Sequence, residues 1–519
     1  MSLRIIYGRA GSGKSSFCID DIKNRWAQEP SGPLILIVPE QFSLQAEKSM
    51  VKALGGSGIG SPEVLSFKRL ARRVLDEVGG AAKQHVNQAG KAMIIHSVLD
   101  KYRDNLKAFG RPAGQKGFVN KLSGMLSEFK RYNINPVILE ETTSKVEDRF
   151  LKDKLEDLTL IYSKYEEVLH QMYIDTDDDL TLLKNRIDKS IYLKEAEIWI
   201  DEFSGFTPQE YEVIAKLLQI AYRINVSLCT DCLLDTEQIQ DIDVFSSIKY
   251  TANRLIDIAD ELNINIEKPV ALKPSTPWRY KNSKALHHME EFLFQYPYKV
   301  FKDKTDSLRL LSAANLYNEV ENAAINIVNF CRDKNIRYRD IAVITRNLDD
   351  YEKIVRIIFP QYNIPFFIDK KRAVTDHPLT LLVLSVLQML YKNFSYESVF
   401  RYLKTGLVGI PVSDIDILEN YVLANGIRGS QWYQEDDWDY RINYSIEAEE
   451  PKKEELDLIE RINSIRRTIM EPITLFKDKV KASKKARDLC QYLYEFLCSI
   501  SIPQIIEELE AEYKKQNEL

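Results

Sequence analysis

A glycine-rich segment near the start of the sequence has the composition needed to bind nucleotide phosphates. Gly8 to Ser15 follow the pattern G-x-x-x-x-G-K-[ST], directly after an apolar run. In such a loop Gly8, Gly11 and Gly13 allow backbone N–H groups to turn towards phosphate oxygens. Lys14 supplies a positive charge for the β- and γ-phosphates, and the Ser15 hydroxyl can ligate Mg²⁺. We therefore predict nucleotide binding here, with a fortuitous glycine turn as the alternative.

Two carboxylates add the remaining chemistry of nucleotide hydrolysis. The apolar run at residues 197–202 is typical of a strand, and it ends in Asp201 and Glu202. At this position of a phosphate-loop ATPase, the first carboxylate holds the Mg²⁺ hydration shell and the second orients or deprotonates the attacking water. An acidic pair at a strand end is common by itself. Together with Lys14 and Ser15, however, it predicts a complete hydrolysis centre.

Cysteine and histidine show no comparable catalytic pattern. The one C-x-x-C, formed by Cys229 and Cys232, has no second pair at metal-ligand spacing, so reduced core packing is favoured over zinc binding. The histidines include no H-E-x-x-H arrangement, and His287 and His288 lie in a polar stretch that favours a solvated surface. Scattered, reduced cysteines predict a cytoplasmic location.

Alternating strands and helices position the phosphate loop. The apolar patterns predict strands at residues 3–7, 34–38 and 64–67, with helices at 16–26 and 43–54 between them. A flexible loop is expected at residues 55–60. This alternation is typical of a parallel α/β sheet, in which the first helix points its positive dipole end at the bound anion.

A helical region interrupts this α/β pattern from about residue 80, with no convincing strand before Ile198. It contains a basic stretch at residues 101–132, where eight basic residues face two acidic ones, Asp104 and Glu128. A phosphate-tracking surface and a solvated helical face are both compatible with this stretch. The basic residues are Lys101, Arg103, Lys107, Arg111, Lys116, Lys121, Lys130 and Arg131.

A second α/β unit is predicted after a proline-containing linker at residues 268–277. Its expected strands are residues 308–312, 341–345 and 365–368, its expected helices are 318–332 and 349–359, and it has no phosphate loop. From residue 373 the pattern is helical again, with a buried helix at 379–390 and a charged final helix. Acidic stretches at 435–437 and 447–450 are expected to be solvated loops.

Composition sets the outer bounds. A chain of 519 residues is too long for one core, so about three or four structural units are expected. The net charge of −6 carries no global signal for nucleic acid, and any DNA contact must use local basic faces. The sequence starts with a predicted strand rather than a secretory signal, and the longest apolar stretch is too short to span a bilayer. We expect no membrane partner.

Two α/β lobes, each interrupted by helices, resemble the superfamily 1 helicases of the UvrD type, and the motifs resemble most closely the AddB subunits of bacterial AddAB (RexAB-like) helicase–nucleases. The similarity extends over essentially the whole chain, and the order and spacing of the motifs carry it. They are Y-G-R-A-G-S-G-K-S at residues 7–15, V-P-E-Q-F-S-L-Q-A-E at 38–47, V-L-S-F-K-R-L-A-R-R at 64–73, W-I-D-E-F-S-G-F-T-P-Q-E at 199–210, I-A-V-I-T-R at 341–346 and V-T-D-H-P-L at 374–379.

This resemblance implies an α/β fold of two RecA-like parallel-sheet lobes, each with a helical insertion domain. Arg346 matches the second-lobe arginine that reaches the γ-phosphate in helicases, and Gln41, Phe42, Ser66 and Phe67 match segments that contact single-stranded DNA. Phenylalanine suits base stacking, with core packing as the alternative. The implied divisions are a first lobe in two parts (1–80 and 191–267), its helical insertion (81–190), an incomplete second lobe (268–372) and a truncated second insertion (373–519).

The sequence departs from the helicase pattern near the nucleotide site. Only seven residues precede Gly8, where UvrD-type helicases place an adenine-binding glutamine motif further upstream. Ser204 and Gly205 replace the glutamine and aspartate of D-E-x-Q-D, and Cys229 to Cys232 replace part of G-D-x-x-Q. These departures favour a degenerate helicase-like module with weakened coupling between γ-phosphate and DNA.

The resemblance implies a protein that binds DNA, ATP and Mg²⁺ within a heterodimer that processes DNA double-strand breaks for recombinational repair. In that family AddA supplies the main motor, and AddB grips the other strand and scans it for the regulatory Chi sequence. The nuclease and its iron–sulfur cluster are expected only in a carboxyl-terminal region that this chain lacks. An actively translocating, DNA-stimulated ATPase is one alternative, and a phosphate-loop kinase acting on a small molecule is another.

Overall fold

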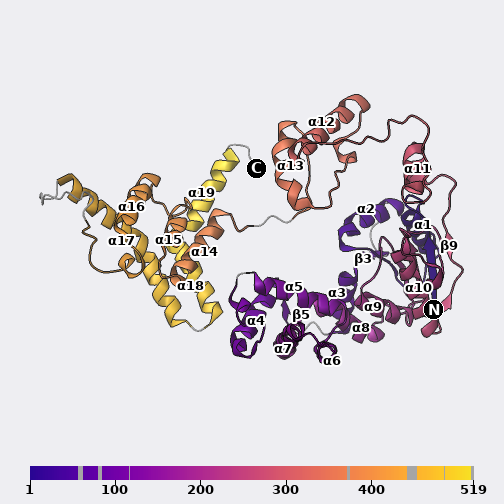
Figure 1. Ribbon diagram of the computed structural model, residues 1–519, viewed down its shortest axis with the longest axis horizontal. Coiled ribbons are helices and arrows are strands. Elements are labelled where there is room, and N and C mark those ends of the chain that lie inside the picture. Colours follow the sequence, from indigo (N-terminus) through magenta and orange to yellow (C-terminus); the bar gives the residue numbers. More distant parts are fainter. Residues whose placement is uncertain are drawn as a thin grey trace. The chain divides into compact units, whose positions relative to one another are not determined.

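A parallel β-sheet organises the first part of the chain in the computed structural model (Figure 1). The structure describes residues 1–55, 62–79, 84–115, 117–370, 374–440, 453–483 and 485–515. Most of the loop predicted at 55–60, Lys116 of the basic stretch and the acidic stretch at 447–450 lie outside the described residues. Two compact units, Met1–Leu311 and Ser312–Leu519, divide the chain.

The sheet of the first unit has the strand order β3-β2-β6-β7-β1-β8, and β9 also pairs with β1. All of its pairings are parallel. Strand β7 therefore lies between β1, which leads into the phosphate loop, and β6, which leads into Asp201. The strands are β1 (Ser2–Tyr7), β2 (Leu34–Ile37), β3 (Glu63–Leu65), β6 (Glu197–Ile200), β7 (Arg223–Leu228), β8 (Asn265–Ile266) and β9 (Val270–Ala271).

Helices cover both faces of this sheet, because successive side chains of each buried strand point to opposite faces. Ile198 and Ile200 pack on one face, and Trp199 packs on the other. The face of Trp199 is covered by α1 (Lys14–Trp26) and α2 (Ser43–Ala53). The opposite face is covered by α3 (Phe67–Val78), α8 (Asp179–Arg186), α9 (Pro208–Leu218) and α10 (Ser246–Glu261).

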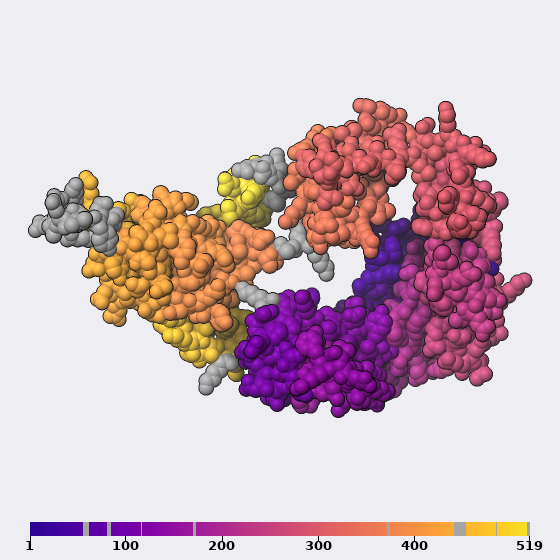
Figure 2. Space-filling model, in the orientation of Figure 1, coloured from indigo at the N-terminus to yellow at the C-terminus, as the bar shows by residue number. Residues whose placement is uncertain are grey.

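The predicted helical insertion has its own core, formed by buried residues such as Leu126, Ile161 and Tyr165. Its helices are α4 (Gln88–Lys101), α5 (Phe118–Arg131), α6 (Pro136–Ser144) and α7 (Arg149–Met172). The prediction that no strand lies between about residue 80 and residue 198 is wrong, because β4 (Gln84–Val86) and β5 (Tyr173–Asp175) pair in a small parallel sheet. Three-residue strands are too short to produce a clear period-2 pattern. In Figure 2 the atoms of the insertion continue into those of the sheet domain without a break.

Two boundaries in the first unit differ from the sequence prediction. Helix α8 lies within the range predicted for the insertion, yet its residue Leu183 and the following Ile187 belong to the core beneath the sheet. The predicted linker at 268–277 contains β9, which pairs with β1, and the unit continues to Leu311. In both places tertiary contacts, which local sequence patterns do not record, decide where the chain belongs.

The second unit begins with two packed helices, α12 (Leu316–Lys334) and α13 (Leu348–Gln361). The strands predicted at 308–312, 341–345 and 365–368 are not strands in the structure. Their apolar side chains are uncovered: Leu310, Ile344 and Phe367 are 99%, 92% and 88% exposed. A strand requires a neighbouring strand as its hydrogen-bonding partner, and among the described residues no strand pairs with these segments.

Six further helices of the second unit surround a separate apolar core that includes Trp432 and Trp438. The buried helix predicted at 379–390 is confirmed as α14 (Pro378–Tyr391). The others are α15 (Tyr396–Leu403), α16 (Val412–Asn425), α17 (Lys453–Ala482), α18 (Ala486–Ser499) and α19 (Ile502–Lys515). Among the described residues, none of the helices combines the length and apolar composition needed to cross a lipid bilayer.

Candidate functional site: a nucleotide site at the carboxyl edge of the first sheet

The phosphate loop connects β1 to the first turn of α1, as the sequence predicts. Its path requires glycine: Gly11 and Gly13 have φ values of 75° and 96°, in the left-handed region that other residues rarely adopt. Gly13 directly precedes α1, so the unpaired N–H groups of the helix start face the loop. The Lys14 ammonium lies back across the loop and donates to the carbonyl oxygens of Gly8 (2.9 Å) and Arg9 (3.1 Å).

The two carboxylates, Asp201 and Glu202, come directly after β6, at the same edge of the sheet as the phosphate loop. Asp201 comes directly after β6 and is 4% exposed, and its Oδ1 accepts a hydrogen bond from the Ser227 hydroxyl of β7. Glu202 is exposed and has a φ of 69°, a strained conformation for a residue other than glycine. Its Oε1 accepts a 3.0 Å hydrogen bond from the Ser15 hydroxyl. The structure thus brings Ser15, Asp201 and Glu202 together.

The buried thiol of Cys18, in α1, lies near both Asp201 and Lys14. Burial raises the pKa of Cys18 well above its ordinary value, and the nearby Asp201 carboxylate raises it further. The Lys14 ammonium acts on the same thiol in the opposite direction. A neutral thiol therefore lies beneath the site, within electrostatic range of both groups.

A short helix that directly follows the predicted linker lies against the phosphate loop. It is η7 (Trp278–Tyr280). A Cβ atom on Gly13 would lie 3.3 Å from Cδ1 of Trp278, and one on Gly11 would lie 2.7 Å from Cβ of Arg279. Trp278 is 64% exposed, and the Lys281 ammonium lies over its ring, 3.3 Å from the centroid. These residues were not identified from the sequence; the signal that could have found them is the aromatic and basic cluster that directly follows the proline-containing stretch.

Arg9 ties the phosphate loop to the helix that follows this segment, α11 (Lys284–Phe292). Its Nε donates to Oε1 of Glu290 at 3.0 Å, and its Nη2 donates to the Glu290 carbonyl oxygen at 2.6 Å. The guanidinium also lies over the Phe245 ring, 5.2 Å from its centroid. These contacts hold α11 at the edge of the loop.

The residues of this edge fit a magnesium nucleotide. The hydroxyl and carboxylate oxygens of Ser15, Asp201 and Glu202 are the hard ligands that Mg²⁺ prefers, and Mg²⁺ is commonly held by one or two carboxylates together with phosphate oxygens. Within the described part of the chain no group of three or more His, Cys, Asp or Glu residues could hold a metal by itself. The buried hydroxyl of Ser12, inside the loop, has no hydrogen-bond partner among the described residues.

A cavity of about 290 Å³ lies between the insertion and the sheet domain, beside the predicted DNA-contacting segments. Ser66 and Phe67 line it, together with Lys68, Arg131 and Phe203. Ser66 and Phe67 are each 4% exposed. Phe67 packs against Phe203, with ring centroids 5.5 Å apart, so core packing, the alternative given for this residue, describes most of its surface.

Gln41 and Phe42 belong to the short helix η1 (Glu40–Phe42), where Gln41 is exposed and Phe42 is half-buried. Neither side chain is among those lining the 290 Å³ cavity, although the adjacent Glu40 is. Arg346 lies in the second unit, exposed, just before α13. Its role at the nucleotide site stays a prediction.

The basic stretch of the insertion is less available for phosphate than its composition suggests. Lys130 is buried in a cluster of carboxylates, with Asp178 at 2.8 Å and Glu166 at 2.9 Å. Lys107 pairs with Glu156 and Asp153. Within the described part of the stretch, the exposed basic side chains that remain are Lys101, Arg103, Arg111, Lys121 and Arg131.

Comparisons with known proteins agree with the position of these motifs. The family described as "ADDB, N-terminal" matches residues 5–290, and the family described as "UvrD-like helicase C-terminal domain" matches residues 281–516. The chain is 46% identical over 519 residues to a protein of Clostridium kluyveri (strain NBRC 12016) that is named as a subunit of an ATP-dependent helicase/deoxyribonuclease. That alignment covers 100% of this chain and 45% of the relative.

This chain is also 48% and 45% identical to proteins of the same name from two other organisms. They are Clostridium botulinum (strain Langeland / NCTC 10281 / Type F) and Acetivibrio thermocellus (strain ATCC 27405). Each alignment covers 100% of this chain and 45% of the relative. The chain therefore spans about half the length of the curated relatives that it matches. With the match over residues 5–290, these similarities show that the chain belongs to the ADDB family, with a UvrD-like helicase domain in its second half.

Proposed function

We propose that this chain is the nucleotide- and DNA-binding, helicase-like part of a two-subunit ATP-dependent helicase–deoxyribonuclease. The complex would process DNA double-strand breaks for recombinational repair, with an AddA-type protein as its partner, in the cytoplasm. The observation that carries the proposal is the Ser15–Glu202 hydrogen bond beside Asp201, because it joins the phosphate loop to the strand-end carboxylates at one point. The names of the relatives support the assignment.

When bound, ATP would provide the phosphates and Mg²⁺ would neutralise part of their negative charge. The protein would position both ligands with the side chains of the phosphate loop and the strand-end carboxylates. Lys14 would exchange the carbonyl oxygens of Gly8 and Arg9 for phosphate oxygens. Ser15 and Asp201 would hold the metal, with Ser227 fixing the orientation of the Asp201 carboxylate. Glu202 would leave Ser15 and orient the attacking water. Arg346 would contribute positive charge from the second unit.

Trp278 is the residue that we assign to the nucleotide base. Its ring lies against Gly13 at the start of α1 and is largely exposed, and a base would replace the Lys281 ammonium that lies over it. Stacking on an aromatic ring is sequence-tolerant and is worth about 1–3 kcal/mol per base. This assignment would provide a contact to the base that does not depend on the glutamine motif of UvrD-type helicases.

The 290 Å³ cavity is the place that we assign to single-stranded DNA and, within the complete heterodimer, to scanning for Chi. Lys68 and Arg131 supply exposed positive charge at its wall. Phe203 and Phe67 supply aromatic surface. Gln41 and Phe42 would extend the contact along the strand beyond the cavity.

Binding measurements on the purified chain test the proposal. Titration with a fluorescent ATP analogue in the presence of Mg²⁺ should show saturable binding, and a labelled single-stranded oligonucleotide should bind with a salt-dependent affinity. A chain that binds neither ligand at low salt would overturn the proposal. Transfer of phosphate to a small-molecule acceptor would favour the kinase alternative instead.

An active, DNA-stimulated ATPase is the second candidate function. The position of Glu202 favours it, because this carboxylate already lies within hydrogen-bond distance of Ser15. Phosphate release that increases when single-stranded DNA is added would support it. Nucleotide binding without turnover would favour a non-translocating, DNA-gripping role.

A further inference from the structure

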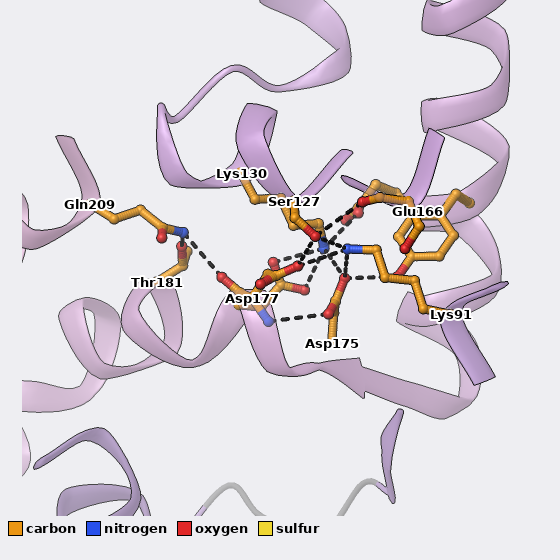
Figure 3. Close-up of polar contacts among 11 residues, drawn as sticks. Lys91, Ser127, Lys130, Glu166, Asp175, Asp177, Thr181 and Gln209 are labelled. Atoms are coloured by element: carbon orange, nitrogen blue, oxygen red, sulfur yellow. Dashed lines mark hydrogen bonds and ion pairs between the residues drawn. The ribbon is translucent and has the colours of Figure 1, made fainter. Parts of the chain in front are cut away.

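A buried glutamine connects the nucleotide-binding sheet to the helical insertion. Gln209 lies in the first turn of α9 and is 5% exposed. Its Nε2 donates to the backbone carbonyl oxygen of Asp177 and to Oγ1 of Thr181, each at 3.2 Å (Figure 3). Asp177 belongs to η4 (Thr176–Asp178), which links the last strand of the insertion to α8.

The Asp177 side chain continues this connection into the insertion. Its Oδ2 accepts hydrogen bonds from the Lys91 ammonium of α4 at 2.7 Å and from the Ser127 hydroxyl of α5 at 2.5 Å. Lys91 is 4% exposed and also lies 3.2 Å from Asp175. Two helices of the insertion are therefore held directly by the residue that Gln209 contacts (Figure 3).

Lys130 and helix α7 complete the cluster. Lys130 pairs with Asp178, with Asp175 at 3.3 Å and with Glu166 of α7. Tyr165, also of α7, donates a 2.7 Å hydrogen bond to Asp175. Separating such buried, hydrogen-bonded charges is costly because each partner would remain uncompensated. Helices α4, α5 and α7 should therefore move together with the 175–178 segment.

The other end of the connection lies next to the nucleotide site. A short loop leads from Glu202 to Thr207, which caps α9 through a reciprocal pair of hydrogen bonds with Glu210. Phe203 and Phe206 of that loop pack against each other and against Phe67. A displacement of Glu202 would thus be transmitted to the start of α9, where Gln209 lies.

The proposed DNA cavity lies directly along this path. Asp177, Thr207 and Gln209 all line it, as does Arg131 at the end of α5. A strand bound there would contact both the insertion and the loop that follows the Mg²⁺-binding carboxylates.

We propose that Gln209 is a positioning residue that couples DNA binding at the insertion to nucleotide binding at the phosphate loop. The coupling passes from Glu202 through the start of α9 to Asp177, and from there to α4 and α5. The inference rests on the proposed function, since it requires that both ligands bind. It adds a physical connection between the two sites in a chain whose sequence departs from the G-D-x-x-Q motif.

A coupling measurement tests this role. The affinity for a fluorescent ATP analogue with Mg²⁺ is measured without DNA and with saturating single-stranded oligonucleotide, and the ratio of the two affinities is the coupling factor. We expect a factor of at least about 5 in the unmodified chain, within the usual range for coupled sites. Gln209→Ala and the isosteric Gln209→Glu, which removes the donor, should reduce the factor to below about 2, close to uncoupled binding.

The matched control is Glu212→Gln. Glu212 also lies in α9 and contacts α8, through a 2.9 Å ion pair with Lys184, but it does not line the cavity. The control should keep the full coupling factor. Thermal unfolding of all variants checks folding, and Gln209→Glu preserves side-chain shape if the alanine variant is unstable.

The possible outcomes separate the two proposals. If the unmodified chain binds both ligands and Gln209→Glu keeps its coupling factor, or if the unmodified chain shows no coupling, the inference is wrong and the proposed function stands. If the unmodified chain binds only one of the two ligands, the inference is wrong; if it binds neither, the proposed function fails as well. Loss of coupling in Glu212→Gln to the same extent would also overturn the specific role of Gln209.

Discussion

The Ser15 hydroxyl donates a 3.0 Å hydrogen bond to Oε1 of Glu202, and this bond joins the first turn of α1 to the end of β6. Strand β7 lies between the strands that lead to these two residues, and its Ser227 holds the adjacent Asp201 carboxylate. The phosphate-binding groups and the hydrolytic carboxylates therefore share one edge of one sheet.

Lys14→Ala should weaken ATP binding by about 10- to 100-fold, because a hydrogen bond to a charged group contributes about 1.5–3 kcal/mol. The measurement is titration with a fluorescent ATP analogue and Mg²⁺. Lys23→Ala is the matched control, since Lys23 is an exposed lysine on the same helix. Equal affinity in the two variants would show that Lys14 does not contact the phosphates.

Glu202→Gln should keep nucleotide affinity and lower any ATP turnover by about 10²- to 10⁴-fold, the usual contribution of a general base. Phosphate release in the presence of single-stranded DNA measures it. The exposed Glu237→Gln on η6 (Thr236–Gln238) should behave like the unmodified chain. Turnover that persists in Glu202→Gln would assign water activation to another group.

Trp278→Ala should weaken ATP binding by about 5- to 100-fold while leaving inorganic tripolyphosphate binding unchanged, because stacking on the base contributes about 1–3 kcal/mol. Competition between the two ligands separates base from phosphate recognition. Trp26→Ala at the other end of α1 is the control, because Trp26 is 42% exposed. An equal loss for both ligands would place Trp278 at the phosphates instead.

Arg346→Ala should lower turnover by about 10³-fold or more if this side chain supplies charge to the γ-phosphate, as arginine fingers do. Nucleotide affinity should change much less. Arg339→Ala in η8 (Tyr338–Asp340), also exposed in the second unit, is the control. An unchanged rate in Arg346→Ala would remove this residue from the site.

The buried carboxyl of Asp178 predicts that the stability of the folded chain depends on pH. Burial raises the pKa of its carboxyl to about 6, against the attraction of Lys130, and Glu166 and Asp175 add to the increase. The folded chain then takes up a proton at a higher pH than the unfolded chain, so this group's contribution to stability is largest below about pH 4 and is lost as the pH rises through about 6.

The free energy of unfolding of the unmodified chain should therefore increase, relative to Asp178→Asn, by up to about 3 kcal/mol as the pH falls from about 7 to about 4. Urea unfolding followed by circular dichroism at several pH values measures this difference. Asp104→Asn, at an exposed position of the insertion, should show no such relative trend. A difference that does not depend on pH would mean that Asp178 titrates normally.

Much of the first lobe was predictable from local pattern. The phosphate-loop motif predicted the strand before it and the helix after it, and both are observed as β1 and α1. The continuous apolar runs at β2 and β6 predicted strands buried on both faces, because such strands carry apolar residues at nearly every position. The strand-end carboxylates were predictable for a related reason, since parallel strands end at a common edge.

The predicted strands of the second unit could not be judged from pattern alone. Residues 308–312, 341–345 and 365–368 have strand-like composition, yet whether a segment forms a strand depends on a hydrogen-bonded neighbour. Residue composition indicates whether a segment is suited to a buried strand, but it does not show whether a neighbouring strand is present to bury it. Leu310, Ile344 and Phe367 are exposed for this reason.

The sequence by itself determined the chemistry of the phosphate loop, the carboxylate pair and the alternation of strands and helices that holds them, because these depend on residues close together in the chain. Only the tertiary structure decided that Ser227 holds Asp201, that Trp278 lies against Gly13 and that Lys130 is buried among carboxylates. Those contacts join residues far apart in the sequence. Strand order and helix packing bring these residues together, and neither can be predicted from a local sequence pattern.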